Sequence, residues 1–312
     1  MPSANKRHVA FIVGPTGVGK TDLSLGIAEE LNAEIVSADS RYLYKRMDIG
    51  TAKPTQEELT RVPHHLVNVA EIDTPWSMSQ FKREALLVIK EIQDKQKMPL
   101  IVGGTGQYIR ALIEGWEVPA QPTDTALRAT ITKWAEEVGG SELHQRLSIL
   151  DPEAAEQIDF RNVRRTIRAL EVIMHTGEKF SEQRNRKPID FSYKIAGLML
   201  PREVLYRRID DRITKMISSG FIEEVKTLLA AGFSLNDPPL SAIGYPEIVR
   251  FLHGECTLEE SVSEIKKRTR QFVRRQANWF KPNDERIRWF DVSRDQKEEI
   301  IQFFLDPSGW RS

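Results

Sequence analysis

A glycine-rich stretch near the N-terminus limits the possible folds of this chain more than any other feature. It reads Gly14-Pro15-Thr16-Gly17-Val18-Gly19-Lys20-Thr21 and matches the pattern G-x-x-x-x-G-K-S/T in full. Glycines let the backbone turn so that its N–H groups point into a concavity of phosphate size, and the following helix adds its positive end. In such a loop Lys20 reaches the outer phosphate, and the hydroxyl of Thr21 holds Mg²⁺. The motif predicts polyphosphate binding, with a nucleotide such as ATP as one candidate. A glycine-rich turn without a ligand is the weaker alternative.

Short apolar runs alternate with helical patterns through the first third of the chain. Residues 9–13 form a continuous apolar run that ends at the glycine-rich stretch, as a buried parallel strand does. Runs at 35–36, 66–69 and 99–102 predict three more strands, with a helix over 81–92 between the last two. The alternation predicts an α/β fold with a parallel sheet flanked by helices, similar to that of P-loop NTPases.

Several candidate site residues follow these predicted strands, at the edge of the sheet where ligands bind. Asp39 and Ser40 come after the second run. A carboxylate there ligates Mg²⁺ or acts as a general base, or else the two residues cap a helix. Gly103, Gly104 and Gly106 follow the fourth run, where glycines admit a ligand close to the backbone or form a tight turn.

The alternation of strands and helices stops after residue 116. Pro119, Pro122, Thr123 and Asp124 favour turns and mark a boundary. From there, 125–176 reads as helix throughout.

The strand pattern returns at 194–200, and a last strand is expected at 287–290. We therefore expect a P-loop core at 1–117 and a helical insertion at 118–192. The remaining residues, 193–312, complete the core and end in a basic, helical region.

Charge balance and cysteine content exclude several protein classes. Lysine and arginine together number 45, as do aspartate and glutamate, so the net charge of zero argues against a protein that coats nucleic acid. With Cys256 alone, one chain forms neither a disulfide nor a cysteine metal site, which fits a reducing cytoplasm. The apolar run at 9–13 is too short for a signal peptide or a membrane span. We expect a soluble, cytoplasmic protein, with a monomer as the default state.

The adjacent histidines His64 and His65 resemble a pair of metal ligands. Neighbours on a strand point to opposite faces, however, and seldom share one metal. A structural or hydrogen-bonding role is therefore favoured.

Two basic segments stand out in the neutral chain. The first carries Arg161, Arg164, Arg165 and Arg168 at helical spacing, so most of the guanidinium groups should face one side. The second comprises Lys266, Lys267, Arg268, Arg270, Arg274 and Arg275, followed by Trp279 and Phe280. Basic helices with nearby aromatic rings suit the phosphates and unstacked bases of RNA loops. A solvated helix face is the alternative for each segment.

Further motifs line up with one family. They are Asp39-Ser40-Arg41-Tyr42-Leu43-Tyr44, Met47-Asp48-Ile49-Gly50-Thr51-Ala52-Lys53-Pro54, Pro63-His64-His65-Leu66, Gly103-Gly104-Thr105-Gly106-Gln107-Tyr108, Asn162-Val163-Arg164-Arg165 and Arg275-Gln276. With the P-loop, they make the chain resemble the bacterial tRNA dimethylallyltransferases, also called tRNA isopentenyltransferases, along nearly its whole length. The stretch 47–54 beside a complete P-loop is the most specific part.

The resemblance implies a prenyl transfer. The donor is dimethylallyl diphosphate, the acceptor is N6 of the adenosine 3′-adjacent to the anticodon, and pyrophosphate is released. The P-loop and Mg²⁺ then stabilise charge on the departing diphosphate through Lys20, Thr21 and Thr16. Asp39 becomes the general base that accepts the N6 proton.

The resemblance also implies where tRNA binds. The helical insertion clasps the anticodon stem-loop, and the target adenosine leaves its stack to reach the site. Neither a membrane nor an obligate protein partner is expected. The residues expected to contact tRNA are Asp39, Ser40, Arg41, Tyr42, Thr105, Arg128, Arg164, Arg165, Arg168, Arg270 and Arg275.

Three positions depart from the family pattern. Tyr42 stands where Gln is frequent, Gln107 stands where Leu is common, and 159–161 replaces a frequent His-Pro-Asn. The alternatives are an enzyme of the same fold acting on free adenine nucleotides, a small-molecule kinase, and a non-enzymatic RNA-binding ATPase. The long insertion and the basic C-terminal helix favour a macromolecular acceptor.

Overall fold

The chain folds into two compact units. The computed structural model describes residues 7–74, 76–116, 124–183 and 186–312. One unit comprises Met1–Ile113 with Ile189–Ser312, and the other comprises Glu114–Pro188. The expected boundary residues Pro119, Pro122 and Thr123 lie outside the described residues, whereas Asp124 caps a helix.

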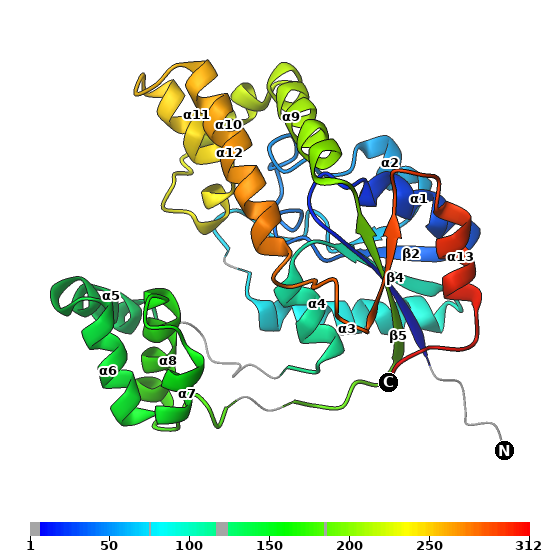
Figure 1. The fold of residues 1–312 in the computed structure, drawn as a ribbon. Helices are drawn as coiled ribbons and strands as arrows, with labels where there is room; N and C mark the ends of the chain where they lie inside the picture. The colour runs from blue at the N-terminus through cyan, green and yellow to red at the C-terminus, as the bar shows by residue number, and fades with distance from the viewer. Residues whose placement is uncertain (1–6, 75, 117–123, 184–185) are drawn as a thin grey trace. The chain divides into compact units, whose positions relative to one another are not determined.

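The first unit is built around a parallel sheet (Figure 1). Among the described residues the sheet has six strands in the order β3-β2-β4-β1-β5-β6. The strands are β1 His8–Val13, β2 Ala33–Ser37, β3 His64–His65, β4 Met98–Gly103, β5 Ser192–Met199 and β6 Ile287–Asp291. β1 lies between β4 and β5, and its residues 9–13 are fully buried, which explains the unbroken apolar run. The predicted α/β fold is confirmed.

The strand predicted at 66–69 is wrong. The described residues of this segment that pair with β2 are His64 and His65, which precede the predicted run, and Leu66 and Asn68 have φ angles of +59° and +57°. Left-handed residues interrupt the extended backbone that a strand ladder requires. The Asn68 side chain accepts a hydrogen bond from Lys53 Nζ at 2.6 Å, which helps to fix this turn.

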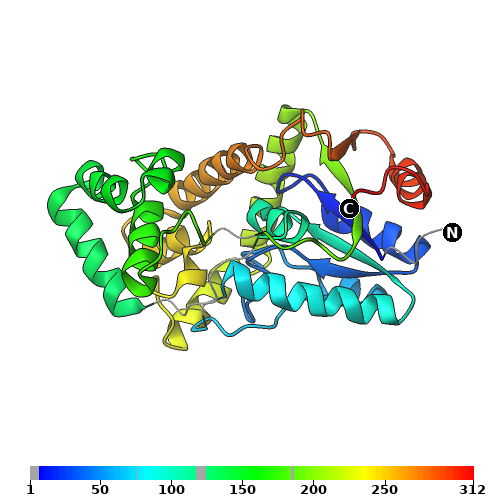
Figure 2. The ribbon, with the colours of Figure 1, turned by 90° about the horizontal axis from the view of Figure 1, so that it is seen from below.

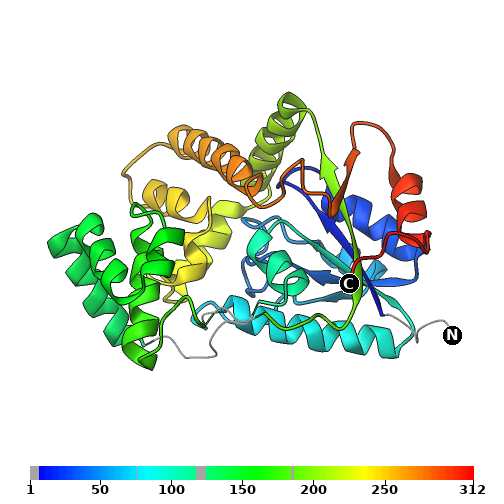
Figure 3. The ribbon, with the colours of Figure 1, turned by 60° about the horizontal axis from the view of Figure 1, so that its bottom comes forward.

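Helices cover both faces of the sheet. α1 and α13 lie on one face and α3, with α4 beside it, lies on the other, as Figures 2 and 3 show from two directions. α9 to α12 lie beyond the carboxyl ends of the strands, in the upper part of Figure 1. The helices of this unit are α1 Lys20–Glu30, α2 Gln56–Arg61, α3 Met78–Asp94, α4 Gly106–Ile113, α9 Arg202–Ser218, α10 Phe221–Ala230, the 3₁₀ helix η1 Pro238–Ser241, α11 Tyr245–Leu252, α12 Leu258–Gln276 and α13 Lys297–Leu305. Within the described ranges, no helix is both long and apolar enough to cross a bilayer.

The second unit is helical and has its own core. Its helices are α5 Thr125–Val138, α6 Gly140–Leu150, α7 Pro152–Gln157 and α8 Val163–Thr176. Leu143, Leu147 and Leu170 are fully buried at the centre of this core. These leucines come from α6 and α8, which are not consecutive in the sequence, so their packing holds the helical unit together.

The prediction of continuous helix over 125–176 is wrong at three points. Gly139, with a φ of +84°, separates α5 from α6. Asp151 caps α7 by accepting a hydrogen bond from Ala154 N–H at 3.0 Å. Asn162 caps α8 by accepting one from Arg165 N–H at 3.2 Å. Glycine ends helices and Asp or Asn begins them, so local side-chain chemistry overrides the average helical pattern.

The two ends of the second unit meet in a short antiparallel neck. Trp116 bridges Arg186, and Lys187 N–H donates a hydrogen bond to the Gly115 carbonyl at 3.0 Å. A Cβ on Gly115 would lie 1.9 Å from the Lys187 carbonyl oxygen, so glycine is required for the two segments to pass this closely.

Candidate active site

The glycine-rich stretch lies between the buried strand β1 and the N-terminus of α1. Gly17 and Gly19 have φ angles of +82° and +100°, and α1 begins at Lys20. A Cβ on Gly17 would lie 2.8 Å from Cγ1 of Ile209, so this glycine serves both the turn and the packing against α9. A loop before a helix N-terminus is an arrangement that holds phosphate groups.

The ammonium group of Lys20 lies folded over this loop. Its Nζ donates to the carbonyl oxygens of Gly14 and Pro15 at 3.0 Å and 2.9 Å. Burial lowers the pKa of Lys20 to about 8. The Asp39 carboxylate opposes this shift, and the Arg212 guanidinium adds to it. An anionic ligand would favour the charged form again, so the site is electrostatically suited to phosphate.

Asp39 follows β2 and lies within the electrostatic reach of Lys20. Its Oδ1 accepts a hydrogen bond from Arg41 N–H at 2.9 Å, and no hydrogen bond among the described residues uses its Oδ2. The next helix, α2, begins only at Gln56, so the interpretation of Asp39 as a helix cap is wrong. One carboxylate oxygen is thus fixed and the other is available to a substrate.

The loop after β4 holds the segment that carries Asp39. Thr105 N–H donates to the Ala38 carbonyl at 3.2 Å, and Thr105 Oγ1 accepts from Ser40 N–H at 3.1 Å. A Cβ on Gly103 would lie 2.3 Å from the Ala38 carbonyl oxygen. At Gly103, then, glycine makes room for protein backbone and not for a ligand.

Arg41 and Tyr42 are turned toward the protein. The Arg41 guanidinium donates to the Pro239 carbonyl of η1 at 3.0 Å, and the Tyr42 phenol donates to the Ala52 carbonyl at 2.7 Å. Burial raises the pKa of Tyr42 above its usual value. The side chains of these two expected tRNA contacts therefore form hydrogen bonds within the protein, in the wall of the site.

Sequence reasoning missed two arginines of α9. Arg208 Nη1 donates to the Val18 carbonyl of the glycine-rich loop at 3.3 Å. Arg212, one turn later, lowers the pKa of Lys20 through its positive charge. A spacing of four residues puts both on one helix face. That spacing, directly after a predicted strand, was the available signal.

The basic residues of α12 divide between internal pairs and the surface. Arg270 forms an ion pair with Asp210 of α9, and its guanidinium lies 5.5 Å from the ring centroid of Tyr206. Arg275 is exposed, and its guanidinium lies 5.9 Å from the ring centroid of Phe272. Arg270 thus joins two helices, whereas Arg275 is open to a phosphate.

In the second unit, Glu171 forms ion pairs with two of the residues expected to contact tRNA. Arg128 Nη2 and Arg168 Nη1 lie 2.6 Å and 3.1 Å from Glu171 Oε2. The Glu171 side chain is buried, so this carboxylate orients both guanidinium groups while parts of them stay exposed.

Arg164 and Arg165 are exposed near the start of α8. Within the described part of the chain, neither forms an ion pair. Arg161 lies before α8 and pairs with Asp159 at 2.6 Å, so the expectation that it shares a helix with the other arginines is wrong.

His64 and His65 make hydrogen bonds within the protein. His64 Nδ1 lies 2.7 Å from the Val62 carbonyl oxygen, and His65 Nε2 lies 2.8 Å from Glu34 Oε2. Both contacts agree with the favoured structural role. Among the residues that the structure describes, no group of three or more His, Cys, Asp or Glu side chains could hold a metal ion.

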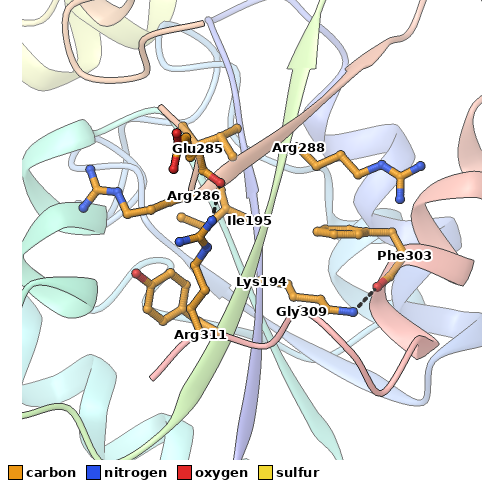
Figure 4. A pocket seen from close by; sticks show the side chains of 10 residues that line it. Lys194, Ile195, Glu285, Arg286, Arg288, Phe303, Gly309 and Arg311 are labelled. Atoms are coloured by element: carbon orange, nitrogen blue, oxygen red, sulfur yellow. Dashed lines mark hydrogen bonds between the residues drawn. The ribbon is translucent and has the colours of Figure 1, made fainter. Parts of the chain in front are cut away.

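A separate pocket lies between β5, β6 and the C-terminal segment (Figure 4). There Lys194 Nζ donates to the Phe303 and Asp306 carbonyls, each at 2.7 Å. These carbonyls are at the C-terminal end of α13, where a cation satisfies groups that the helix leaves unpaired. No expected site residue lines this pocket.

Comparison with known proteins identifies relatives along nearly the whole chain. The family model described as IPP transferase matches residues 42–283. The tRNA dimethylallyltransferase of Carboxydothermus hydrogenoformans is 43% identical over 302 residues, covering 96% of each chain. That of Dictyoglomus turgidum is 44% identical over 298 residues, covering 95% of this chain and 91% of the relative.

Solved structures agree with the sequence matches. The tRNA isopentenylpyrophosphate transferase of Bacillus halodurans is 38% identical with a TM-score of 0.72, covering 96% of both chains. A eukaryotic dimethylallyltransferase acting on tRNA is 27% identical with a TM-score of 0.82, covering 98% of this chain and 81% of that chain. The family match, the identities and the shared fold lead to one conclusion, that the chain belongs to the IPP transferase family.

Proposed function

We propose that this protein transfers a dimethylallyl group from dimethylallyl diphosphate to N6 of the adenosine 3′-adjacent to the anticodon in tRNA. A bond forms between N6 and C1 of the dimethylallyl group. The bond between C1 and the diphosphate oxygen breaks, and its electron pair leaves with pyrophosphate. The observation that carries the proposal is that a phosphate loop with Lys20 and the carboxylate of Asp39 follow β1 and β2 of one parallel sheet and interact electrostatically. One site then combines leaving-group stabilisation with a base.

The diphosphate of the donor binds in the glycine-rich loop. Pro15 has no N–H and Thr16 N–H donates to Gln276, so Gly17 and Gly19 are the expected backbone N–H donors of this loop. Lys20, Arg208 and Arg212 supply positive charge that stabilises the departing pyrophosphate. ATP would compete for the same loop.

Mg²⁺ suits the donor set at this loop. Among the described residues there is no acidic cage. Mg²⁺ commonly takes few protein ligands and completes its shell with phosphate oxygens and water, so the Thr21 hydroxyl is its expected protein ligand. When bound, the ion supplies Lewis-acid stabilisation of the leaving group.

Asp39 accepts the proton from N6. The lone pair of this amine is delocalised into the adenine ring, so N6 attacks carbon well only as its proton is removed. Arg41 N–H holds one oxygen of Asp39, and the second oxygen faces the substrate in this proposal. Ser40 and Thr105 keep the carboxylate segment in place.

The proposed tRNA contacts are of two kinds. Arg164, Arg165 and Arg275 are exposed cations suited to phosphates, whereas Arg128 and Arg168 are oriented by Glu171. Ser40, Tyr42 and Thr105 border the site that receives the adenine. Arg41 acts indirectly through the wall of that site, and Arg270 acts indirectly through α12. The helical insertion, expected at 118–192 and found as the unit Glu114–Pro188, clasps the anticodon stem-loop in this proposal. The enzyme acts as a cytoplasmic monomer without an obligate protein partner.

A transfer assay tests the proposal. Radiolabelled dimethylallyl diphosphate and Mg²⁺ are incubated with the enzyme and either unmodified tRNA or free AMP. We expect label in tRNA at the adenosine 3′ of the anticodon. Label in AMP alone would move the protein to the free-nucleotide enzymes, and label in neither would remove the transferase proposal.

The pKa of Lys20 predicts a proton-linked step in pyrophosphate binding. Above about pH 8 the Lys20 side chain of the ligand-free enzyme is mostly neutral. A bound anion favours its protonated form, so pyrophosphate binding should take up a proton and weaken as pH rises. Calorimetry at pH 8.5 in two buffers of different ionisation enthalpy measures this uptake. Lys20→Arg, which stays charged, is the control and should lack the Lys20 component. Equal uptake by both enzymes would contradict the assignment.

Arg165→Gln should weaken tRNA binding with a change in its salt dependence. Loss of one phosphate contact is expected to reduce the slope of log affinity against log salt by about 1. Titrations at several salt concentrations measure it. Arg146→Gln is the matched control, because Arg146 lies on α6 and pairs with Glu142 at 2.7 Å. An unchanged slope for Arg165→Gln would leave Arg165 as a solvated side chain.

A further inference from the structure

The side-chain amide of Gln276 joins two loops of the candidate site. Gln276 is the last residue of α12 and is 5% exposed. Thr16 N–H donates to its Oε1 at 2.9 Å, and its Nε2 donates to the Gly104 carbonyl at 3.0 Å. One partner is an N–H and the other is a carbonyl, so only one orientation of the amide satisfies both.

The glycines after β4 are shaped around the end of α12. A Cβ on Gly104 would lie 2.4 Å from Gln276 Nε2, and a Cβ on Gly106 would lie 2.3 Å from the Trp279 side chain. Larger residues at these positions would displace the amide or the indole. The glycines therefore serve a buried contact with α12, and a primary amide is the group that fits between the loops.

Each loop controls one half of the proposed reaction. Thr16 belongs to the loop that receives the diphosphate. Gly104 directly precedes Thr105, whose hydroxyl holds Ser40 beside Asp39. The amide thus connects the leaving-group side of the site with the side that carries the base.

We propose that Gln276 is a positioning residue that fixes the phosphate loop relative to the loop that orients Asp39. This inference rests on the proposed function. Gln276 contacts protein backbone on both sides and acts on the reaction only through these loops. Loss of either hydrogen bond lets the carboxylate and the departing pyrophosphate move out of alignment, and errors of about 1 Å in such alignment cost up to 100-fold in rate.

Two variants separate positioning from stability. Gln276→Met has similar length but no hydrogen-bonding group, so its single-turnover rate should fall about 100-fold at every pH. Gln276→Glu keeps an acceptor for Thr16 N–H but, when ionised, faces the Gly104 carbonyl with a second acceptor. Its protonated form can donate to that carbonyl, so its rate relative to wild type should recover as pH falls from 8 to 6. Donor KM and the Kd for tRNA should stay within about threefold for both variants, because neither loses a substrate contact.

Gln302→Met and Gln302→Glu serve as controls, because Gln302 is exposed on α13. Reaction amplitude reports the active fraction and the rate constant reports positioning. Wild-type rate constants in both Gln276 variants, or losses confined to amplitude without the pH-dependent recovery, would overturn the positioning role. If wild-type enzyme transfers no label, the proposed function fails and the positioning role fails with it. An active wild type with fully active variants removes the positioning role alone.

Discussion

Replacing Asp39 with asparagine is expected to slow dimethylallyl transfer about 10³-fold, because general-base catalysis contributes roughly 10²- to 10⁴-fold. Asparagine retains an Oδ1 that can accept the hydrogen bond from Arg41 N–H, so the turn after β2 should survive. The variant loses only the ability to take a proton from N6. Single-turnover transfer at saturating donor and tRNA measures the effect, since product release then does not hide the chemical step.

The affinity for tRNA gives the internal control for this variant. Phosphate contacts dominate such affinities, and Asp39 supplies none, so Kd should change by no more than about twofold. Asp94→Asn, at the exposed end of α3, is the matched carboxylate control and should keep the wild-type rate. A rate for Asp39→Asn within a few-fold of wild type would show that another group accepts the proton.

Replacing Lys20 with methionine is expected to lower kcat/KM for the donor by about 10²- to 10³-fold. The Lys20 ammonium is the cation that the loop itself supplies. Without it, the negative charge that develops on the departing pyrophosphate is less stabilised. Stability should not fall at pH 7, because burial already disfavours the charged form of Lys20. Steady-state kinetics with varied donor, together with thermal unfolding, measure the two effects separately.

Lys90→Met is the control for the loss of a lysine, because Lys90 is exposed on α3. Lys20→Arg adds a second comparison, since it keeps the charge on a larger, planar group. If Lys20→Met were to retain donor kinetics while losing tRNA binding, the loop would not be the donor site.

The fold was largely predictable because its strongest signals are local. β1, its glycine-rich turn and α1 follow from one contiguous segment, and β5 and β6 were expected close to where they lie. The failures have equally local causes. Leu66 and Asn68 adopt left-handed conformations that an apolar pattern does not reveal. In the insertion, averaging over helical periodicity hid the caps that divide it into separate helices.

The site was predictable only as far as motifs reach. Lys20, Thr21 and Asp39 sit in recognisable patterns, whereas the pairing of Arg128 with Glu171 joins residues 43 positions apart. The contact between Thr16 and Gln276 spans 260 positions. The local sequence around either partner does not predict such a contact. Arg208 and Arg212 become site residues only because α9 returns over the loop after β1.

The neck formed by Gly115 and Lys187 bears on how a protein of this kind changes over evolution. Because the two ends of the second unit meet there, the sheet-containing unit is interrupted by a segment whose start and end lie side by side. Residues can be inserted, deleted or replaced between these two positions while the connection from α4 to β5 is kept. Positions where the two ends of a segment lie together tolerate such changes. Under the proposed function, RNA recognition by the second unit and bond chemistry in the first can therefore diversify at different rates as heritable modules of one gene.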